Sequence, residues 1–221
     1  MSNQRKRPPF LLLLYQHYLE RQDAAEFARC VAELYTVGTL ERLATSECRE
    51  IRRAAVLALG FLGDYESNHV LGRALTDEDR AVRVLAENSI RTIWTRAGSE
   101  ADRQELGAII RLNAAQLYKE AVNRAAKLIE RAPWFAEAWY QRAVALAALG
   151  RLSDAIRDCH QTLEINPYHF LAATSMGQAH LQLGNTVSAL ECFRRALQLN
   201  PNLEGVRAVV ERLTRTVEGG K

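Results

Sequence analysis

The 221 residues of this chain are enough for a sizeable core or for an elongated array of small units, and 48% of them are hydrophobic, as in ordinary globular proteins. The 29 basic and 26 acidic side chains almost cancel, so the formal net charge of +3 gives no reason to expect a nucleic acid or a membrane surface as partner. No apolar stretch is long enough to span a membrane, and we expect a cytoplasmic protein.

The N-terminal residues are similar to an export signal only in part. Basic residues at positions 5–7 precede an apolar run, but that run is only six residues long and no small-residue cleavage site follows it. We therefore expect no export. Residues 1–9 are predicted to be a disordered tail, and a first helix is predicted from Phe10 to Glu20.

An internal repeat of 31 residues follows. Residues 40–55 match residues 71–86, and in each copy a short polar stretch precedes an apolar helix. The stretches are residues 46–48 in the first copy and residues 77–79 in the second. Acidic or hydroxyl side chains there are expected to cap the helix and to favour its positive end.

The helices of the two copies open on Ile51-Arg52 and Val82-Arg83, and a run of small and apolar residues follows the first pair. These residues resemble the Val-Arg step of HEAT repeats, which are stacked helical hairpins. The resemblance implies that Arg52 and Arg83 are structural and that each bonds an acidic residue or a helix end of its neighbour. An anion site is the less favoured alternative for the two arginines.

The earliest hairpin of this array is predicted to be degenerate. Residues 30–38 align with residues 55–63, and Gly38 is expected to end the second helical run. The HEAT-like array is thus predicted over residues 10–98, in two and a half to three hairpins.

Beyond the seam at residues 97–100, two more helices are predicted, over residues 100–114 and 117–131. Ala121, Ala125, Leu128 and Ile129 give the second of these helices one apolar face. The turn between the two helices has Gln116 where the later repeats have glycine, which makes this the irregular member of the series.

The rest of the chain repeats with a period of 34 residues. Pro133, Pro167 and Pro201 are spaced by that distance, and Gly150 recurs as Gly184. A fixed period of this length indicates a stacked-repeat architecture, in which no unit buries its apolar face alone. Glycine suits the left-handed residue that ends a helix, and proline stops the next one.

Small residues recur at the same period, as Ala143 and Gly177 and again as Ala155 and Ala189. Together with the glycines and prolines they resemble the tetratricopeptide repeat, a helix–turn–helix hairpin. The resemblance implies an array over residues 99–203 with about three repeats, the first degenerate, and a capping helix over residues 204–216. The predicted fold is therefore all-α, an α-solenoid of antiparallel hairpins in which HEAT-like repeats precede tetratricopeptide repeats.

The sequence contains no arrangement of residues that indicates catalysis, a cofactor or a metal. The five histidines never fall at metal-ligand spacing, and the four cysteines form no CxxC pair. His180 is expected to be a hydrogen-bonded core residue. Asp154 and Asp158 are expected to lie exposed on an outer helix face.

In tetratricopeptide proteins the first helices of the hairpins line a concave surface that commonly holds a peptide. The resemblance therefore implies a peptide-binding groove on this chain, mildly apolar with amide and phenol groups, which suits an apolar or helical segment of another protein. The alternative is that the chain's own helices fill part of the groove. The candidate contact residues are Leu106, Ile110, Tyr140, Gln141, Val144, Leu171, Thr174 and Gln178.

Some members of that family grip a C-terminal carboxylate with lysine, asparagine and arginine. None of the corresponding positions here carries a basic side chain, so we do not expect this mode of binding. Those positions hold Leu106, Ile110, Gln141, Leu171 and Ser175.

A non-catalytic adaptor that binds another protein is the favoured function, and two alternatives stay open. HEAT-like repeats also occur in bilin lyases, so an accessory role beside an enzyme is conceivable, although no residue spacing supports it. Some HEAT-like proteins hold a nucleic-acid backbone on basic side chains. The candidates for that role here are Arg49, Arg52, Arg53, Arg80 and Arg83.

Overall fold

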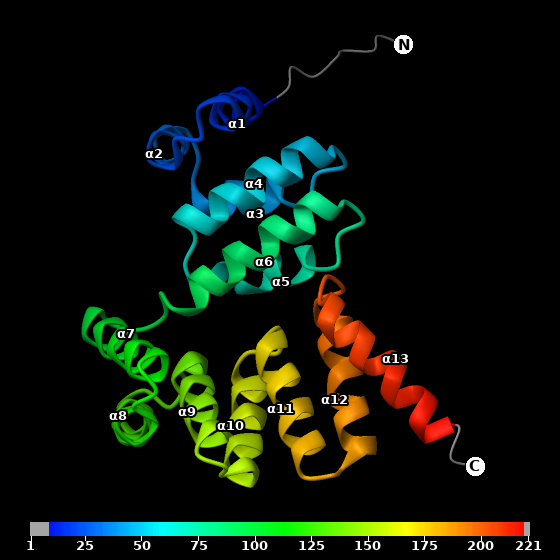
Figure 1. Ribbon diagram of the computed structural model, residues 1–221. Coiled ribbons are helices and arrows are strands. Elements are labelled where there is room, and N and C mark those ends of the chain that lie inside the picture. Colours follow the sequence, from blue (N-terminus) through cyan, green and yellow to red (C-terminus); the bar gives the residue numbers. More distant parts are fainter. Residues whose placement is uncertain (1–8, 219–221) are drawn as a thin grey trace. The chain divides into compact units, whose positions relative to one another are not determined.

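The computed structural model describes residues 9–218, and within that range the chain is 79% helical, with thirteen α-helices and no strand (Figure 1). The predicted all-α class is confirmed. Residues 1–8 of the N-terminal tail expected over residues 1–9 lie outside the described residues, as do residues 219–221. The contacts of the chain group into two compact units that divide between Ile93 and Trp94.

The first unit consists of short antiparallel hairpins and one 3₁₀ turn. Helix α6 begins in this unit and ends at Trp94, the first residue of the second unit. The helices are α1 (Phe10–Arg21), α2 (Ala24–Leu34), α3 (Val37–Leu43), α4 (Arg49–Leu62), α5 (Asn68–Ala74) and α6 (Arg80–Trp94), and the 3₁₀ turn is η1 (Tyr65–Ser67).

Helix α4 is the centre of the first unit. It packs against α1, α2, α3 and α5. It is also joined to α6, because the hydroxyl of Ser89 donates to the carbonyl oxygen of Val56 at 3.1 Å. The run of small and apolar residues from Ala54 to Gly60 is buried throughout, which is why a helix so rich in alanine can be surrounded on several sides.

Arg52 has the structural role that the repeat pattern predicted. It is only 7% exposed, and its Nε and Nη2 donate to the two carboxylate oxygens of Asp77 at 2.8 and 2.9 Å. Its Nη1 donates to the carbonyl oxygens of Ser46 and Glu47. One side chain therefore ties the start of α4 to the turn that precedes α6. Arg83 repeats half of this pattern by donating to the carbonyl oxygen of Asp77 at 2.8 Å.

Helix capping follows the prediction in one repeat and not in the other. Before α6, the carboxylate of Asp79 accepts from the backbone N–H of Val82 at 3.0 Å, as expected. Before α4, the N-cap residue is Cys48, and its side chain makes no capping hydrogen bond. The hydroxyl of Ser46 accepts instead from the N–H of Cys48, so it stabilises the turn and leaves the helix end uncapped.

The expectation that Gly38 ends the second helical run is wrong. Helix α2 already stops at Leu34, and Gly38 lies in the first turn of α3. The reason is a local cap, because the hydroxyl of Thr36 accepts from the N–H of Thr39 and starts a new helix there.

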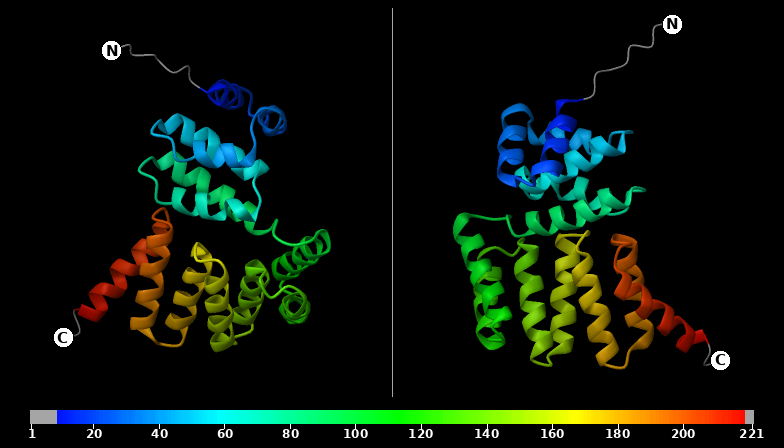
Figure 2. Two further views of the ribbon diagram at one scale, coloured as in Figure 1. Left: turned by 180° about the vertical axis from the view of Figure 1, so that it is seen from behind. Right: turned by 45° about the horizontal axis from the view of Figure 1, so that its top comes forward.

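The second unit is a row of helices in which each packs against the next, as both views in Figure 2 agree. Helices α7, α9 and α11 are the first helices of three hairpins, and α8, α10 and α12 are the second. The helices are α7 (Glu100–Ala114), α8 (Tyr118–Arg131), α9 (Ala136–Ala148), α10 (Leu152–Ile165), α11 (Phe170–Gln182), α12 (Thr186–Leu199) and α13 (Glu204–Glu218).

Small residues set the spacing between these helices. A Cβ atom added to Gly177 in α11 would lie 2.7 Å from the ring of Phe193 in α12, so only glycine allows this approach. The last helix, α13, turns Leu213 and Val206 towards the buried Ala189, Leu190 and Phe193 region of α12. Apolar surface at that end of the row is thus covered.

The turns after α7, α9 and α11 have one backbone geometry although one of them lacks glycine. Gly150 and Gly184 have φ of +76° and +78°, and Gln116 at the corresponding place has φ of +60°. In the degenerate turn, the N–H of Leu117 donates to the carbonyl oxygen of Leu112 at 2.9 Å, as residues 151 and 185 do in theirs. Packing of the repeat therefore imposes a left-handed conformation on a residue that disfavours it.

Replacing Arg52 with alanine is expected to destabilise the first unit strongly. The change leaves the half-buried Asp77 carboxylate, 13% exposed, without its main partner; for a buried pair such a loss typically costs about 3–5 kcal/mol of unfolding free energy. Arg49→Ala is the matched control, because Arg49 is exposed and pairs only with the adjacent Glu50. Urea denaturation of both variants measures the difference. Equal losses in the two variants would contradict the structural role of Arg52.

Replacing Gln116 with glycine is expected to stabilise the second unit by about 1 kcal/mol, because glycine adopts the positive φ without steric cost. Gly150→Ala is the reciprocal change and is expected to destabilise by a similar amount. Thermal unfolding followed by circular dichroism measures both shifts. A lower melting temperature for the Gln116→Gly variant would show that the glutamine side chain supplies something that the turn geometry does not reveal.

Candidate functional site: the first-helix face of the second unit

The candidate site lies on the side of the second unit formed by α7, α9 and α11, which we call the first-helix face. Helix α9 contacts both α7 and α11, so the three first helices are neighbours although their partners alternate with them in the chain. This arrangement brings together residues that are about 30 and 60 positions apart in the sequence.

The predicted contact residues differ in how accessible they are. Leu106 is 1% exposed and belongs to the core of the unit, so its side chain is closed to a ligand in this structure. Gln178 is exposed. The half-buried residues are Ile110, Tyr140, Gln141, Val144, Leu171 and Thr174.

The hydroxyl of Thr174 and the amide of Gln141 are already engaged within the second unit. The hydroxyl of Thr174 donates to the carbonyl oxygen of Phe170 within its own helix at 2.9 Å. The amide of Gln141 donates to the carboxylate of Glu137 at 2.8 Å and accepts from the amide of Asn113 at 3.0 Å. The residues that can offer apolar surface are therefore Ile110, Val144 and Leu171.

A buried polar chain that the sequence reasoning missed joins the three first helices. From Asn113 in α7 it passes through Gln141 and Glu137 in α9. The second carboxylate oxygen of Glu137 then lies 3.1 Å from Nε2 of His169, the N-cap residue of α11. Glu137 and His169 are both buried, at 6% and 0% exposure. This chain fixes the spacing of the helices that form the face.

The hydrogen bonds of His169 decide which ring nitrogen carries the proton. Its Nδ1 accepts from the backbone N–H of Ala172 at 3.1 Å, so Nδ1 cannot be a donor. Nε2 therefore carries the hydrogen and donates it to Glu137. The same imidazole caps α11 and holds the buried carboxylate in place. The ring of Tyr140 lies against it, with the two ring centroids 4.6 Å apart.

A sequence signal for the pair exists, although it is faint. Glu137 and His169 stand 32 residues apart, nearly one repeat, and each lies at the start of a first helix. In a stacked array, residues at the start of successive first helices are close in space. When one of two such residues can donate a hydrogen bond and the other can accept it, the two are therefore candidates for a contact.

His180 departs from its expected role. It is half-buried, and its Nδ1 is a buried nitrogen without a hydrogen-bond partner among the described residues. The expectation of a hydrogen-bonded core histidine is wrong at that atom.

The residues of the second unit with reactive side chains are poorly placed for chemistry. Cys159 is buried, and burial raises the pKa of its thiol to about 12, so the nucleophilic thiolate is not available near neutral pH. The adjacent His160 is exposed and lies 3.9 Å from Glu164 on its own helix. Across residues 9–218, no group of three or more histidine, cysteine or acidic side chains could hold a metal ion.

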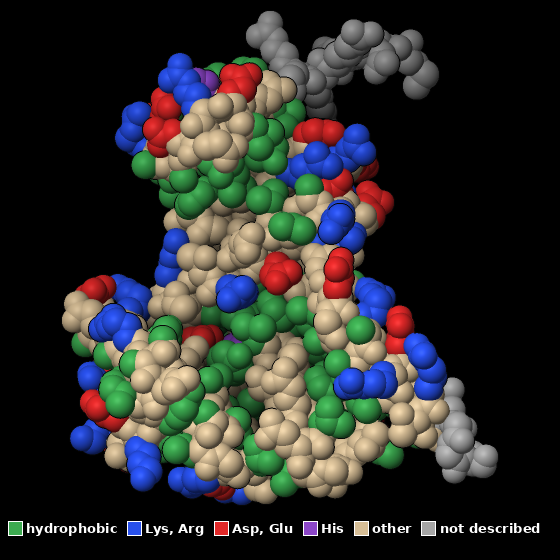
Figure 3. Space-filling view, in the orientation of Figure 1, with side chains coloured by type: hydrophobic (Ala, Val, Ile, Leu, Met, Phe, Trp, Pro, Cys, Tyr) green, Lys and Arg blue, Asp and Glu red, His purple; other side chains and the backbone are tan. Residues whose placement is uncertain are grey.

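Four of the five arginines considered for nucleic-acid binding are engaged within the first unit. Arg49 pairs with Glu50, Arg52 with Asp77 and Arg53 with Asp79, and Arg83 donates to backbone carbonyls. On the face seen in Figure 3, Lys and Arg side chains alternate with Asp and Glu and form no continuous basic patch. None of the helices in the described part of the chain is long and apolar enough to cross a membrane.

Comparison with protein families confirms both kinds of repeat. The tetratricopeptide repeat model matches residues 136–169 and 171–203, and the HEAT repeat model matches residues 36–127. The chain therefore carries HEAT repeats followed by tetratricopeptide repeats.

Among curated relatives, the Hsp70-Hsp90 organizing protein of Triticum aestivum is 34% identical over 95 residues, which are 43% of this chain and 16% of that protein. The human DnaJ homolog subfamily C member 7 is 35% identical over 83 residues, which are 38% of this chain and 17% of that protein. The chain thus matches about a sixth of the length of each of these relatives.

One solved structure supports the helical-repeat fold. The first tetratricopeptide domain of Spaghetti (RPAP3), bound to the HSP90 peptide SRMEEVD, superposes with a TM-score of 0.52 and 20% sequence identity. The match covers 55% of this chain and 96% of that domain. At this level of identity the likeness concerns the fold alone.

Removing the carboxylate of the buried chain is expected to destabilise the second unit. In a Glu137→Ala variant, Nε2–H of His169 and the amide of Gln141 lose their acceptor, at a cost of about 1–3 kcal/mol each. Glu137→Gln keeps one acceptor oxygen and is expected to lose less. Chemical denaturation of the two variants compares their free energies of unfolding. A Glu137→Gln variant as unstable as Glu137→Ala would rule out the proposed hydrogen-bond chain.

Proposed function

We propose that this chain is a non-catalytic adaptor of the cytoplasm, and that its second unit binds an apolar or helical segment of another protein on the first-helix face. The observation that carries the proposal is that half-buried apolar side chains, Ile110, Val144 and Leu171, lie on all three neighbouring first helices. Apolar side chains on such a face suit the apolar side of an amphipathic helix.

The relatives support a peptide-binding role. Proteins that share its tetratricopeptide segment are named as an organizing protein for Hsp70 and Hsp90 and as a DnaJ homolog, and the similar solved domain was captured with an HSP90 peptide. By analogy, the segment in this chain is a peptide-binding module. Fold alone does not assign a ligand, so the ligand class must come from the residues of the face.

Those residues favour an apolar ligand over an acidic one at this face. The positions that grip a C-terminal carboxylate in some relatives hold leucine, isoleucine, glutamine and serine here. Glu137 adds a buried acidic group beside them. A ligand that carries its own carboxylates would find no basic side chain at those positions to balance them. We therefore expect the SRMEEVD peptide to bind poorly at this face.

The buried polar chain supplies the rigidity that a binding face needs. Hydrogen bonds from Asn113 to His169 hold the three first helices in register before a ligand arrives. A preformed face loses less conformational entropy when it binds, which favours affinity.

Selection of peptides from a random library with the whole chain, followed by fluorescence polarisation with the selected peptide, tests the proposal. Val144→Asp places a charge on α9, the middle helix of the face, and is expected to weaken binding at least about tenfold, since a desolvated, unpaired charge costs more than 1.4 kcal/mol. Gln178→Ala, at the exposed end of the face, is expected to cause a smaller loss.

Val187→Asp is the matched control, because Val187 is 60% exposed on α12 and lies outside the first-helix face. It is expected to leave the affinity unchanged. Selected peptides that bind the wild type and the Val144→Asp variant equally well, with Val144→Asp still folded by circular dichroism, would overturn the assignment of the face.

A further inference from the structure

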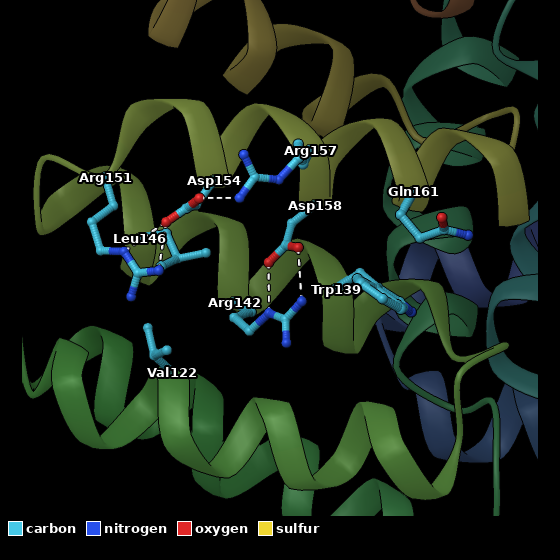
Figure 4. A pocket seen from close by; sticks show the side chains of 9 residues that line it. All are labelled: Val122, Trp139, Arg142, Leu146, Arg151, Asp154, Arg157, Asp158 and Gln161. Atoms are coloured by element: carbon cyan, nitrogen blue, oxygen red, sulfur yellow. Dashed lines mark hydrogen bonds and ion pairs between the residues drawn. The ribbon is translucent and has the colours of Figure 1, made fainter.

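A charged groove lies on the other side of the second unit, and neither the repeat framework nor the proposed function accounts for it. It is a cavity of about 420 Å³ between α8 and α10, with α9 as its floor (Figure 4). The size falls within the range of about 300–1,000 Å³ that is typical of ligand pockets. Its lining residues are Val122, Trp139, Arg142, Leu146, Arg151, Asp154, Arg157, Asp158 and Gln161.

A buried ion pair forms the floor of this groove. Arg142 donates from Nε and Nη2 to the two carboxylate oxygens of Asp158 at 2.6 and 2.8 Å. Its guanidinium carbon also lies 4.9 Å from the centre of the Trp139 ring. Asp158 is only 5% exposed, so the expectation that it lies on an exposed outer face is wrong. The partner that explains its burial comes from α9, on the floor.

The neighbouring repeat shows that this ion pair is not needed for packing. One period later, the places of Arg142 and Asp158 are taken by Met176 and Cys192, which belong to an apolar cluster. Replacing a buried ion pair by apolar residues is often neutral or stabilising. The charged pair therefore contributes something other than stability, and a binding site is the simplest reason for a charge at an apolar position.

A second carboxylate at the rim is shared between two arginines. Asp154 accepts from Nε of Arg151 at 2.7 Å and also pairs with Arg157. These hydrogen bonds hold the pKa of the Asp154 carboxyl below its usual range, and the bond from Arg151 has the larger effect. The expectation that Asp154 is simply solvated is therefore also wrong. The corresponding residues of the next repeat are Asn185, Ser188 and Glu191, which cannot form this cluster.

The groove has an excess of positive charge with unused donors. Three arginines line it against two aspartates. The carboxylates occupy the Nε and Nη2 groups of Arg142 and Arg151. Figure 4 shows that each of these guanidinium groups turns its remaining nitrogen away from its carboxylate, toward α8 and Val122. Carboxylates placed there could accept from these nitrogens, beside the apolar surface of Val122 and Leu146.

We propose that this groove is a second binding site, for an acidic peptide segment of a partner protein whose carboxylate side chains contact Arg142 and Arg151. Val122, Leu146 and the Trp139 ring provide contact for an apolar residue next to that carboxylate. The site lies between second helices, so it can be occupied independently of the first-helix face. A chain with two such sites can hold two segments with opposite chemical preferences.

Fluorescence polarisation with a labelled eight-residue peptide of alternating glutamate and leucine tests this site on the whole chain, with a lysine–leucine peptide as the charge control. We expect the acidic peptide to bind, with an affinity that falls as salt is raised. The double variant Arg142→Met/Asp158→Cys copies the next repeat and is expected to bind at least about tenfold more weakly while it keeps its thermal stability, measured under reducing conditions.

Arg151→Gln is the second variant, because Arg151 is 57% exposed in a turn and its loss should not affect folding. It is expected to weaken binding about threefold to tenfold. Arg195→Gln on α12 removes an exposed arginine that does not line the groove, and it is expected to bind as the wild type does.

Equal binding by Arg151→Gln, by the double variant and by Arg195→Gln would overturn the proposal, and so would equal binding of the acidic and basic peptides. The same measurement is repeated with inorganic phosphate added at constant ionic strength. If phosphate displaced the peptide at a concentration no higher than that of the peptide, the groove would be a site for small anions instead. None of these results depends on the first-helix face, whose own test uses Val144→Asp.

Discussion

The structure depends on one constraint, which is that a single helical hairpin of about 34 residues cannot bury its own apolar side. Each hairpin of the second unit completes its core with the next. The cluster that contains Ala143, Leu146, Ala155, Leu163 and Ala172 draws residues from α9, α10 and α11. Small residues at the crossing points let helices approach until side chains such as Phe193 fill the space over Gly177. Because the core is continuous, the helix faces that remain outside are long and regular.

Regular faces allow changes at a few positions to create a site. The first-helix face is apolar where Ile110, Val144 and Leu171 lie, and the buried chain from Asn113 to His169 holds it rigid. On the other side, two substitutions relative to the next repeat turn an apolar seam into a groove with an ion pair on its floor. Arg52 shows the contrasting use of a buried charge. It satisfies a carboxylate and two carbonyl oxygens at once, and it ties the start of α4 to the turn before α6.

Much of the architecture could be predicted from the sequence because the signals repeat. The period of the prolines and of Gly150 and Gly184 predicted the hairpins of the second unit, and the helix bounds 100–114 agree with those observed. The prediction for Gly38 failed because a local hydrogen bond decided the outcome, since Thr36 caps a new helix that includes Gly38. The turn at Gln116 has the backbone conformation of the glycine turns because packing around it fixes that geometry.

The sites were harder to predict than the fold. Leu106 was assigned to the binding face by its place in the repeat, yet its side chain lies in the core. The Glu137–His169 pair and the Arg142–Asp158 pair each join residues from different helices, and a single sequence does not reveal which polar residues meet. Comparing the second repeat with the third would have shown that Arg142 and Asp158 stand where the third repeat has Met176 and Cys192. That comparison uses no information beyond the chain itself.

The central claim is that the first-helix face is the surface that recognises a partner segment. Methyl NMR of the chain with isoleucine, leucine and valine labelled, titrated with a peptide selected by the protein, tests it most directly. The account predicts that the methyl signals of Ile110, Val144 and Leu171 shift together and saturate at one concentration. Shifts confined to Leu190, Val209 and Val210 on α12 and α13, with those three signals unmoved, would contradict it.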